Sequence, residues 1–306
     1  MRPTLLILAG PTASGKTDLS IQMAKHWKTE ILSCDSRQMY REISIGTAKP
    51  EPEQLRKVPH HLINNLSIQD YYSAYKFEQE ALALLKKLFL QHSLVIMTGG
   101  TGLYMDAIIN GIDDIPDPDP QIRASMKLRY DSEGLANLLD ELLVLDPDYY
   151  AKVDRGNPAR VMRGLEVCLT TGRTFSSFRV KQAVLRDFKI ILTGLAVPRD
   201  ELYDRINTRV EQMIGKGLVE EARSMYPFRH LNALNTVGYR ELFQMFDGTI
   251  DLEEAIRLIQ RNTRHYAKRQ ITWNNRYPQM TYFHPQKGEG IIKWIESVVD
   301  GRDKTP

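Results

Sequence analysis

The residues best suited to chemistry lie close to the start of the chain, in the octet GPTASGKT at residues 10–17. The octet matches the pattern G-x-x-x-x-G-K-[ST] and stands between an apolar run and a helical pattern, which is the context that the pattern requires. Its glycines let successive backbone N–H groups point at one anion, and its lysine adds a positive charge. We therefore predict a phosphate or diphosphate site made of Gly10, Pro11, Thr12, Ala13, Ser14, Gly15, Lys16 and Thr17. Thr17 is the expected protein ligand of a Mg²⁺ ion.

Two further strand patterns end in polar residues. The run at residues 30–34 is followed by Asp35, and the run at residues 94–97 is followed by the turn Thr-Gly-Gly-Thr, which ends at Thr101. In a doubly wound sheet the ligand lies at the carboxyl ends of the strands, so we expect Asp35 to face the phosphate site. Many ATPases and GTPases carry a Mg²⁺-binding acid where this chain has the glycine turn. That difference disfavours a motor-type NTPase.

The chain as a whole has the composition of a soluble globular protein. It holds 306 residues, of which 42% are apolar and 26% charged, and this length predicts one or two domains. No apolar run reaches the ~18–20 residues of a membrane span, and the first residues show no signal-peptide pattern. The two cysteines have no metal-binding spacing. We expect a cytoplasmic protein without membrane contact, and a monomer because no coiled-coil pattern is visible.

The order of the patterns predicts an α/β fold with an interruption. Strand patterns occur at residues 5–9, 30–35, 59–63, 94–97 and 188–195, and we take the last as the final strand. A segment rich in Asp and Pro at residues 112–120 marks a boundary. Helical patterns at residues 121–130, 135–145 and 158–170 follow it. We therefore predict a P-loop nucleoside triphosphate hydrolase-like core with a parallel sheet at residues 1–112 and 187–306, and an all-helical insertion at residues 113–186.

Positive charge is concentrated near the end of the chain, although the net charge is only +3. Residues 257–276 contain no acid, and a helix there would place Arg257, Arg261, Arg264 and Lys268 on one face. The other face would bury Ile256, Ile259, Thr263 and Tyr266. The basic face predicts contact with a polyanion. Arg205 and Arg209, four residues apart on an earlier helix, are compatible with either a solvated pair or a pair that neutralises a leaving diphosphate.

Several separated motifs together resemble one family. They are GPTASGKT at residue 10, SCDSRQMY at 33, IGTAKP at 45 and TGGTGLY at 98, joined by PHHLI, AVPRDELYDRI, NTVGYRE and AKRQITWNNR. They closely resemble the bacterial tRNA dimethylallyltransferases, also called tRNA isopentenyltransferases, from residue 5 to about residue 273. The resemblance implies transfer of the dimethylallyl group of dimethylallyl diphosphate to the exocyclic amine of the adenosine next to the anticodon on its 3′ side. It also implies Mg²⁺, release of diphosphate, and tRNAs that read codons beginning with U.

The resemblance also implies roles for individual residues. Asp35 matches the catalytic base, Thr101 would hydrogen-bond the incoming amine, and Lys16 would stabilise the leaving group. The matching positions for contact with the anticodon stem-loop are Asp35, Ser36, Arg37, Gln38, Thr101, Arg123, Ala159, Arg160, Val161, Met162, Arg163, Asn235, Gly238, Tyr239 and Arg240. Arg264 and Lys268 on the basic face would bind RNA phosphates, and the insertion would close over the RNA as a clamp.

Three alternatives remain open at this point. A small-molecule kinase would use ATP at the same loop, but it would leave the glycine turn and the basic helix without a role. An adenylate isopentenyltransferase would keep the donor and act on free nucleotides. A non-catalytic RNA-binding module is disfavoured by the intact Lys16, Thr17 and Asp35.

Overall fold

The computed structural model describes residues 2–180 and 184–301. Within them a six-stranded sheet has the order β3-β2-β4-β1-β5-β6, and all neighbouring strands are parallel. The strands are β1 (Thr4–Ala9), β2 (Ile31–Ser33), β3 (His60–His61), β4 (Leu94–Thr98), β5 (Lys189–Leu195) and β6 (Thr281–Phe283). The expected parallel α/β core is confirmed. The prediction that residues 188–195 form the final strand is wrong, because β6 pairs with β5 beyond it.

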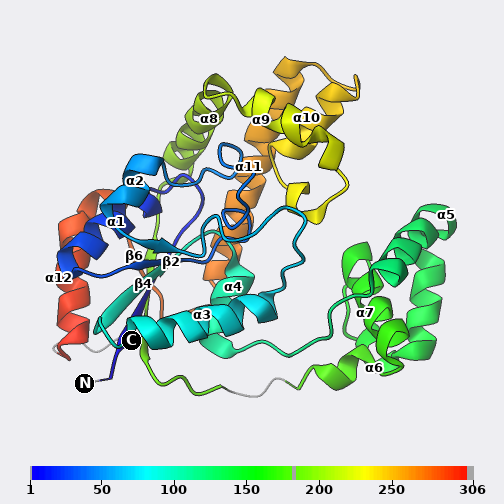
Figure 1. Cartoon of the computed structure of the whole chain (residues 1–306), viewed down its shortest axis with the longest axis horizontal. Helices are drawn as coiled ribbons and strands as arrows, with labels where there is room; N and C mark the ends of the chain where they lie inside the picture. The colour runs from blue at the N-terminus through cyan, green and yellow to red at the C-terminus, as the bar shows by residue number, and fades with distance from the viewer. Residues whose placement is uncertain (1, 181–183, 302–306) are drawn as a thin grey trace. The chain divides into compact units, whose positions relative to one another are not determined.

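Helices cover the sheet on both faces, because its central strand β1 is apolar on both faces. All six residues of β1 are buried, and Leu6 stands in register with Ile96 of β4 and Ile191 of β5. One face packs against α1 (Lys16–Trp27) and α12 (Gly288–Val299), as Figure 1 shows. Neighbouring residues of a strand point to opposite faces. Ile7 accordingly lines a small cavity with Met105 of α4 (Gly102–Asn110).

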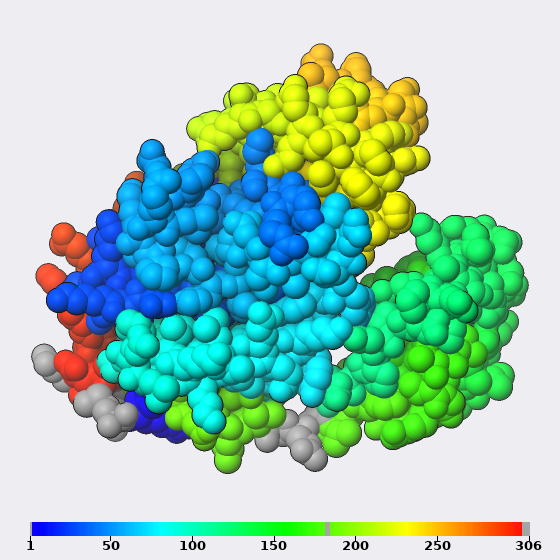
Figure 2. All heavy atoms as spheres, viewed as in Figure 1, coloured from blue at the N-terminus to red at the C-terminus, as the bar shows by residue number. Residues whose placement is uncertain are grey.

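A second apolar cluster joins the later helices to an early loop. It contains residues of α8 (Arg199–Gly215), α9 (Leu218–Met225), α10 (Tyr239–Phe246) and α11 (Leu252–Asn274), together with Tyr40 and Ile43. In Figure 2 the blue segment around residue 45 lies against the yellow segment that holds α9 and α10. Segments almost two hundred residues apart in sequence therefore form one wall.

The chain divides into two compact units. The first comprises Met1–Tyr72, Glu80–Ile109 and Leu185–Pro306, and the second comprises Ser73–Gln79 and Asn110–Val184. The first unit contains the whole sheet and α2 (Pro52–Lys57). Helix α3 (Ala74–Leu88) begins in the second unit and continues in the first. Four short 3₁₀ helices complete the described elements: η1 (Phe175–Phe178), η2 (Tyr226–Phe228), η3 (Asn232–Leu234) and η4 (Pro285–Lys287).

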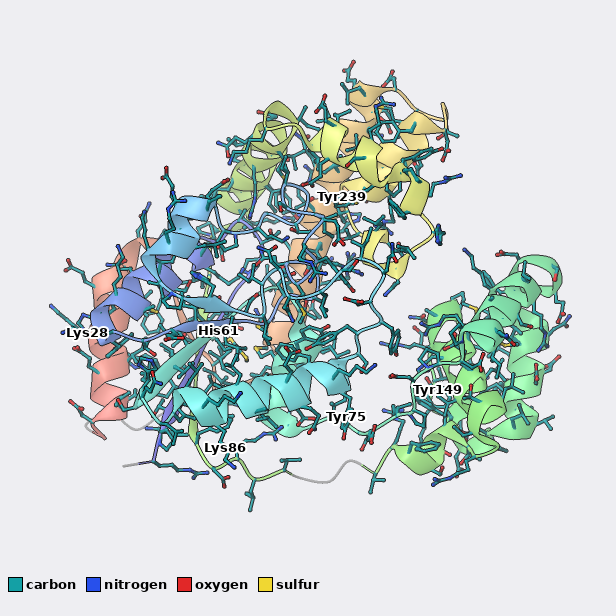
Figure 3. All side chains as sticks on the ribbon, viewed as in Figure 1. Lys28, His61, Tyr75, Lys86, Tyr149 and Tyr239 are labelled. Atoms are coloured by element: carbon teal, nitrogen blue, oxygen red, sulfur yellow. The ribbon has the colours of Figure 1, made fainter. Side chains whose placement is uncertain are left out.

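The second unit is helical and has its own core. Its helices are α5 (Pro120–Leu145), α6 (Pro147–Tyr150) and α7 (Pro158–Thr171). Asp119 begins α5 by accepting from two N–H groups of the first turn, and Gly134, at φ 82°, breaks the helix where the sequence predicted two separate helices. Leu138, Leu142 and Leu165 pack with Tyr149, which Figure 3 labels.

Among the described residues, no helix is both long enough and apolar enough to cross a membrane.

Candidate active site

The phosphate-loop sequence forms a tight turn between β1 and α1. Gly10 has φ 151° and Gly15 has φ 91°, and a Cβ atom on Gly10 would lie only 2.9 Å from the Ser14 hydroxyl. Helix α1 begins directly after Gly15 and has no side-chain cap, so its first N–H groups are left for a ligand. The Ser14 hydroxyl is fully buried and has no hydrogen-bond partner among the described residues. This turn has the geometry of an anion-binding site.

Two half-buried cations, Lys16 and Arg209, lie at the loop. Lys16 Nζ donates to the carbonyls of Gly10 and Pro11, each at 2.8 Å. Burial, together with the nearby Arg209 guanidinium, lowers the pKa of Lys16 to about 8. Arg209 Nη1 donates to the Thr12 hydroxyl at 3.4 Å, and burial lowers the pKa of Arg209 as well. Because these two half-buried positive charges repel each other, the site favours binding of an anion between them.

Asp35 and Thr101 lie at the ends of neighbouring strands, β2 and β4. Asp35 Oδ1 accepts from the N–H groups of Arg37 at 2.9 Å and Gln38 at 3.3 Å, which fixes the carboxylate. The Thr101 hydroxyl accepts from the Ser36 N–H at 2.9 Å and donates to the Ser36 hydroxyl at 3.0 Å. The two residues expected to handle the acceptor amine are therefore held by the same short turn.

One open cavity of about 1380 Å³ in the first unit connects these groups. The phosphate loop from Thr12 to Thr17, the turn from Asp35 to Gln38, and Thr101 all line it. Its described lining includes eight lysines and arginines but three acids, so the cavity is strongly positive and suits an anionic ligand. The cations are Lys16, Arg37, Lys49, Arg205, Arg209, Lys216, Arg240 and Arg269.

Arg205 and Arg209 differ in what they contact. Arg209 reaches the phosphate loop, whereas Arg205 forms an ion pair with Glu201 at 2.6 Å on its own helix. Both line the cavity. Arg209 is therefore the better placed of the two to bind a diphosphate at the loop.

Two glycines near the cavity are covered by aromatic rings from later in the chain. A Cβ atom on Gly46 would lie 2.5 Å from the ring of Tyr239, and one on Gly102 would lie 2.5 Å from the ring of Trp273. Only glycine leaves room for these rings. The walls of the cavity thus depend on α10 and α11 as well as on the loops after the strands.

The cavity is also lined by a part of α11 that the sequence pattern did not assign to the site. Tyr266, Arg269, Gln270 and Trp273 line it. The buried residues of α11 are Ala255, Ile259, Ala267, Gln270 and Asn274. Of the predicted stripe, Ile259 is buried, Ile256 is half-buried against the same cluster, and Thr263 and Tyr266 are half-buried. Three of the lining residues, Arg269, Gln270 and Trp273, belong to the motif AKRQITWNNR.

The structure corrects two of the expected tRNA contacts. Val161 is 0% exposed in the core of the helical unit, and Tyr239 is 0% exposed with its hydroxyl donating to Glu221 at 2.5 Å (Figure 3 labels Tyr239). Neither side chain is available to a nucleic acid. Their neighbours Arg160 and Arg240 are exposed.

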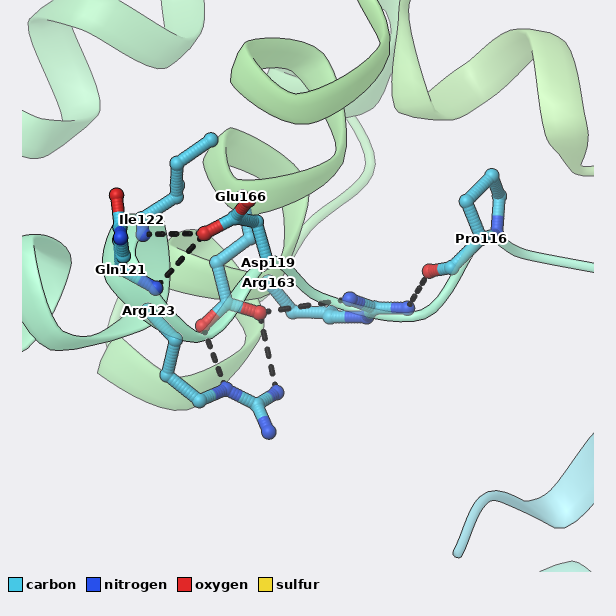
Figure 4. A network of polar contacts seen from close by, with 7 residues as sticks. All are labelled: Pro116, Asp119, Gln121, Ile122, Arg123, Arg163 and Glu166. Carbon is cyan, nitrogen blue, oxygen red and sulfur yellow. Dashed lines mark hydrogen bonds and ion pairs between the residues drawn. The ribbon is translucent and has the colours of Figure 1, made fainter. Parts of the chain in front are cut away.

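Two other expected contacts in the helical unit, Arg123 and Arg163, bind a buried acid. Arg123 donates through two nitrogens to Glu166 at 3.0 and 3.1 Å, and Arg163 lies 3.4 Å from the same carboxylate (Figure 4). Arg163 also donates to the carbonyl of Pro116 at 2.7 Å. Through these contacts the two arginines attach the first turn of α5, and the segment just before it, to helix α7. Of the other matching positions there, Ala159 is exposed and Met162 is half-buried.

The remaining expected contacts are divided between the cavity and the basic face. Asn235 and Gly238 line the cavity. Arg264 donates to Asn207 at 2.7 Å and is half-buried, while Lys268 is exposed.

Comparison with known proteins places the chain in a family. The model of the IPP transferase family matches residues 38–277. The chain belongs to the IPP transferase family. The family prediction made from the motifs is thereby confirmed. Among members of the IPP transferase family, tRNA dimethylallyltransferase 1 of Porphyromonas gingivalis is 53% identical over 289 residues, which cover 94% of this chain and 96% of that one. A protein of the same name from Bacteroides fragilis is 50% identical over 296 residues, covering 97% and 98%.

Two solved structures have a similar fold. The crystal structure of the full-length tRNA isopentenylpyrophosphate transferase of Bacillus halodurans has a TM-score of 0.71 at 34% identity, and covers 98% of each chain. A eukaryotic dimethylallyltransferase, captured in crystallographic snapshots acting on tRNA, has a TM-score of 0.73 at 26% identity. That match covers 89% of this chain and 69% of the other.

Proposed function

We propose that this protein transfers the dimethylallyl group of dimethylallyl diphosphate to the exocyclic amine of the adenosine 3′-adjacent to the anticodon, in tRNAs that read codons beginning with U. One observation carries the proposal: the phosphate loop, Asp35 and Thr101 line a single, strongly positive cavity. A phosphate loop alone serves many reactions, but here a fixed carboxylate stands at the neighbouring strand end. The names of the chain's relatives support transfer of a dimethylallyl group to a tRNA.

In the proposed reaction the amine nitrogen attacks the first carbon of the allylic group. The N–C bond forms as the C–O bond to diphosphate breaks, and the electron pair leaves with the diphosphate. The N–H groups of the phosphate loop, Lys16 and Arg209 stabilise the charge that develops on the leaving group, because they are fixed before the reaction begins. Asp35 takes the proton that the amine loses, and the Thr101 hydroxyl orients that amine. The products are a prenylated adenosine and diphosphate.

The site suits a magnesium ion that is held mainly by substrate. Within residues 2–180 and 184–301, no group of three or more His, Cys, Asp or Glu side chains could hold a metal. Thr17 lines the cavity at the start of α1, and its hydroxyl would bind the ion together with diphosphate oxygens and water. Mg²⁺ is commonly bound in this way, with few protein ligands. When bound, it neutralises charge on the diphosphate.

For the acceptor, we propose the anticodon stem-loop of tRNA. An enzyme that modifies a stacked base must take that base out of the stack into a pocket. The cavity is large enough for a base, and the exposed Asn235 and Arg240 lie on its lining. We propose in addition that the helical insertion, residues 113–186, acts as a clamp on the RNA through exposed cations such as Arg160. We propose a monomer as the active form.

The test compares two acceptors for the prenyl donor and, in parallel, offers ATP as an alternative donor. Purified protein, Mg²⁺ and radiolabelled dimethylallyl diphosphate are incubated with an anticodon stem-loop or with free AMP, and a parallel reaction supplies γ-labelled ATP. We expect label in the stem-loop only. Label in AMP would instead indicate an adenylate isopentenyltransferase, and movement of the γ-phosphoryl group onto a metabolite would indicate a kinase.

A variant of the base tests the mechanism within the same assay. Asp35→Asn keeps the shape of the side chain but removes its basicity, so turnover should fall about 10²- to 10⁴-fold. Binding of inorganic pyrophosphate, measured by calorimetry, should stay within a few-fold of wild type because the phosphate loop is untouched. Near-normal turnover in this variant would refute Asp35 as the base.

A further inference from the structure

Gln270 bridges the two halves of the active site. This α11 residue is 7% exposed, and its amide contacts two loops that are each more than 160 residues away in sequence. Its Oε1 accepts from the N–H of Thr12 in the phosphate loop at 2.7 Å. Its Nε2 donates to the carbonyl of Gly100, in the turn after β4, at 2.9 Å. The orientation of the amide is fixed, because rotating it would place its NH₂ group against an N–H and its oxygen against a carbonyl.

The Gly100 end of this bridge lies beside the proposed base. A Cβ atom on Gly100 would lie 2.8 Å from Asp35 Oδ2, 2.9 Å from Gln270 Nε2 and 3.1 Å from the Tyr266 hydroxyl. Tyr266 donates a second hydrogen bond to the same carbonyl at 2.9 Å. Gly100 directly precedes Thr101, so the carbonyl that Gln270 holds is part of the turn that presents Thr101.

The Thr12 end of the bridge determines which N–H groups of the phosphate loop remain for an anion. In a turn of this type, consecutive N–H groups point toward the ligand. Here the Thr12 N–H is already used by Gln270, and the Ser14 N–H points to the carbonyl of Pro11 at 3.3 Å. The N–H groups at the start of α1, around Gly15 and Lys16, are left as the anion donors. Gln270 therefore helps to fix where the diphosphate binds along the loop.

We propose that Gln270 is a positioning residue. By bonding to both the phosphate loop and the Gly100 turn, it fixes their relative position and so sets the distance between the leaving diphosphate and the acceptor amine. This inference rests on the proposed prenyl transfer. It assigns to Gln270 no contact with the reacting atoms. Fixed placement of two reactants accounts for a large part of enzymatic rate, and a misplacement of about 1 Å can cost about 100-fold.

Substitutions at Gln270 separate the two ends of the bridge. Gln270→Glu keeps an oxygen that can accept from Thr12 but replaces the donor to Gly100 with a repelling oxygen. Gln270→Met has a similar length and removes both hydrogen bonds. Tyr266→Phe removes only the second donor to Gly100. Thr272→Ala, an exposed position on the same helix, is the matched control.

The experiment measures kcat and both KM values for these variants, with dimethylallyl diphosphate and the stem-loop, beside thermal unfolding of each protein. For Gln270→Glu we expect kcat to fall about 10- to 100-fold with KM for the donor changed less than about threefold. Gln270→Met should lose kcat and also raise the KM for the donor, because the phosphate loop is released as well. Tyr266→Phe should lose less kcat than either, and Thr272→Ala should match wild type.

Two results would overturn the positioning role. One is a folded Gln270→Glu and a folded Gln270→Met that both turn over within twofold of wild type. The other is a loss of activity that follows the loss of thermal stability and disappears at a temperature where every variant is folded. Wild type in the same assay keeps this test separate from the proposed function: if wild type prenylates the stem-loop and the variants match it, only the role of Gln270 fails. If wild type itself transfers no dimethylallyl group, the proposed function fails.

Discussion

Removing the carboxylate of Glu221 should loosen the loop that forms one wall of the cavity. Glu221, on α9, accepts from the N–H groups of Ser44 at 2.8 Å and of Ile45 and Gly46 at 2.9 Å each. It also accepts from the Tyr239 hydroxyl at 2.5 Å. One side chain therefore holds three consecutive N–H groups of the segment that continues into the cavity lining. We predict that Glu221→Ala destabilises the first unit and weakens turnover.

The loss in the free energy of unfolding can be estimated from the four hydrogen bonds that Glu221 accepts. The N–H of the exposed Ser44 can bond to water instead, so its loss costs little. The Tyr239 hydroxyl belongs to a fully buried residue, and leaving it without an acceptor costs about 1–3 kcal/mol. The half-buried N–H groups of Ile45 and Gly46 add about 0.5–1.5 kcal/mol each. The expected loss in the free energy of unfolding is about 2–6 kcal/mol.

Tryptophan fluorescence provides the assay, because Trp27, Trp273 and Trp294, the chain's three tryptophans, all belong to the first unit. Equilibrium unfolding in urea would be followed for wild type, Glu221→Ala and Glu220→Ala. Glu220 is an exposed acid one position earlier on the same helix, so its substitution makes the same change in charge and should leave the midpoint unchanged.

A partial variant sharpens the same test. Tyr239→Phe removes one of the four donors while keeping the ring over Gly46, and should cost about 0.5–1.5 kcal/mol. If Glu221→Ala unfolds at the same urea concentration as Glu220→Ala, the carboxylate does not hold the loop and the reasoning is refuted.

Three other predictions concern charge and titration. Arg123→Ala should lower the urea midpoint measured by circular dichroism in the absence of tRNA, because it takes one of two arginines from the buried Glu166; an unchanged midpoint with weaker tRNA binding would instead assign Arg123 to the RNA. Lys268→Ala should reduce the slope of log affinity for tRNA against log salt by about 1, and Arg264→Ala by less, since its guanidinium is held by a neighbouring helix. Burial raises the pKa of the Cys34 thiol to about 12, so the thiol is protonated at pH 8 and loses its proton only as the pH approaches 12. Native protein at pH 8 should leave Cys34 unmodified by iodoacetamide in peptide mapping, and rapid modification would contradict its burial.

The parts of the fold that local sequence determines were predictable. β1, β2 and β4 are short apolar runs, and a strand buried on both faces needs little else to be recognised. The glycines of the phosphate loop require a backbone that few other residues adopt, so the turn can be predicted from its sequence alone.

The parts of the fold and of the site that depend on residues far away in the sequence were not predictable from local sequence. β6 is three residues long, and its Tyr282 is exposed, so it exists as a strand through its pairing with β5 and not through a pattern of its own. Tyr239 and Val161 fall in stretches that resemble a tRNA-binding motif, but a motif does not say which of its side chains face inward. For Arg163 a signal was present, since Glu166 lies three residues later on the same helix face. The site role of Gln270 needed the structure, because both of its partners are far away in sequence.

The rings that cover Gly46 and Gly102 also determine when, during synthesis, the active site can be completed. The loop segments leave the ribosome early, whereas Tyr239 and Trp273 are added only after more than three quarters of the chain has been translated. Until those two rings have been synthesised, Gly46 and Gly102 are not covered, and this part of the cavity wall is absent. A ribosome-bound chain stalled before α11 would therefore carry the whole GPTASGKT sequence and still lack a closed catalytic pocket.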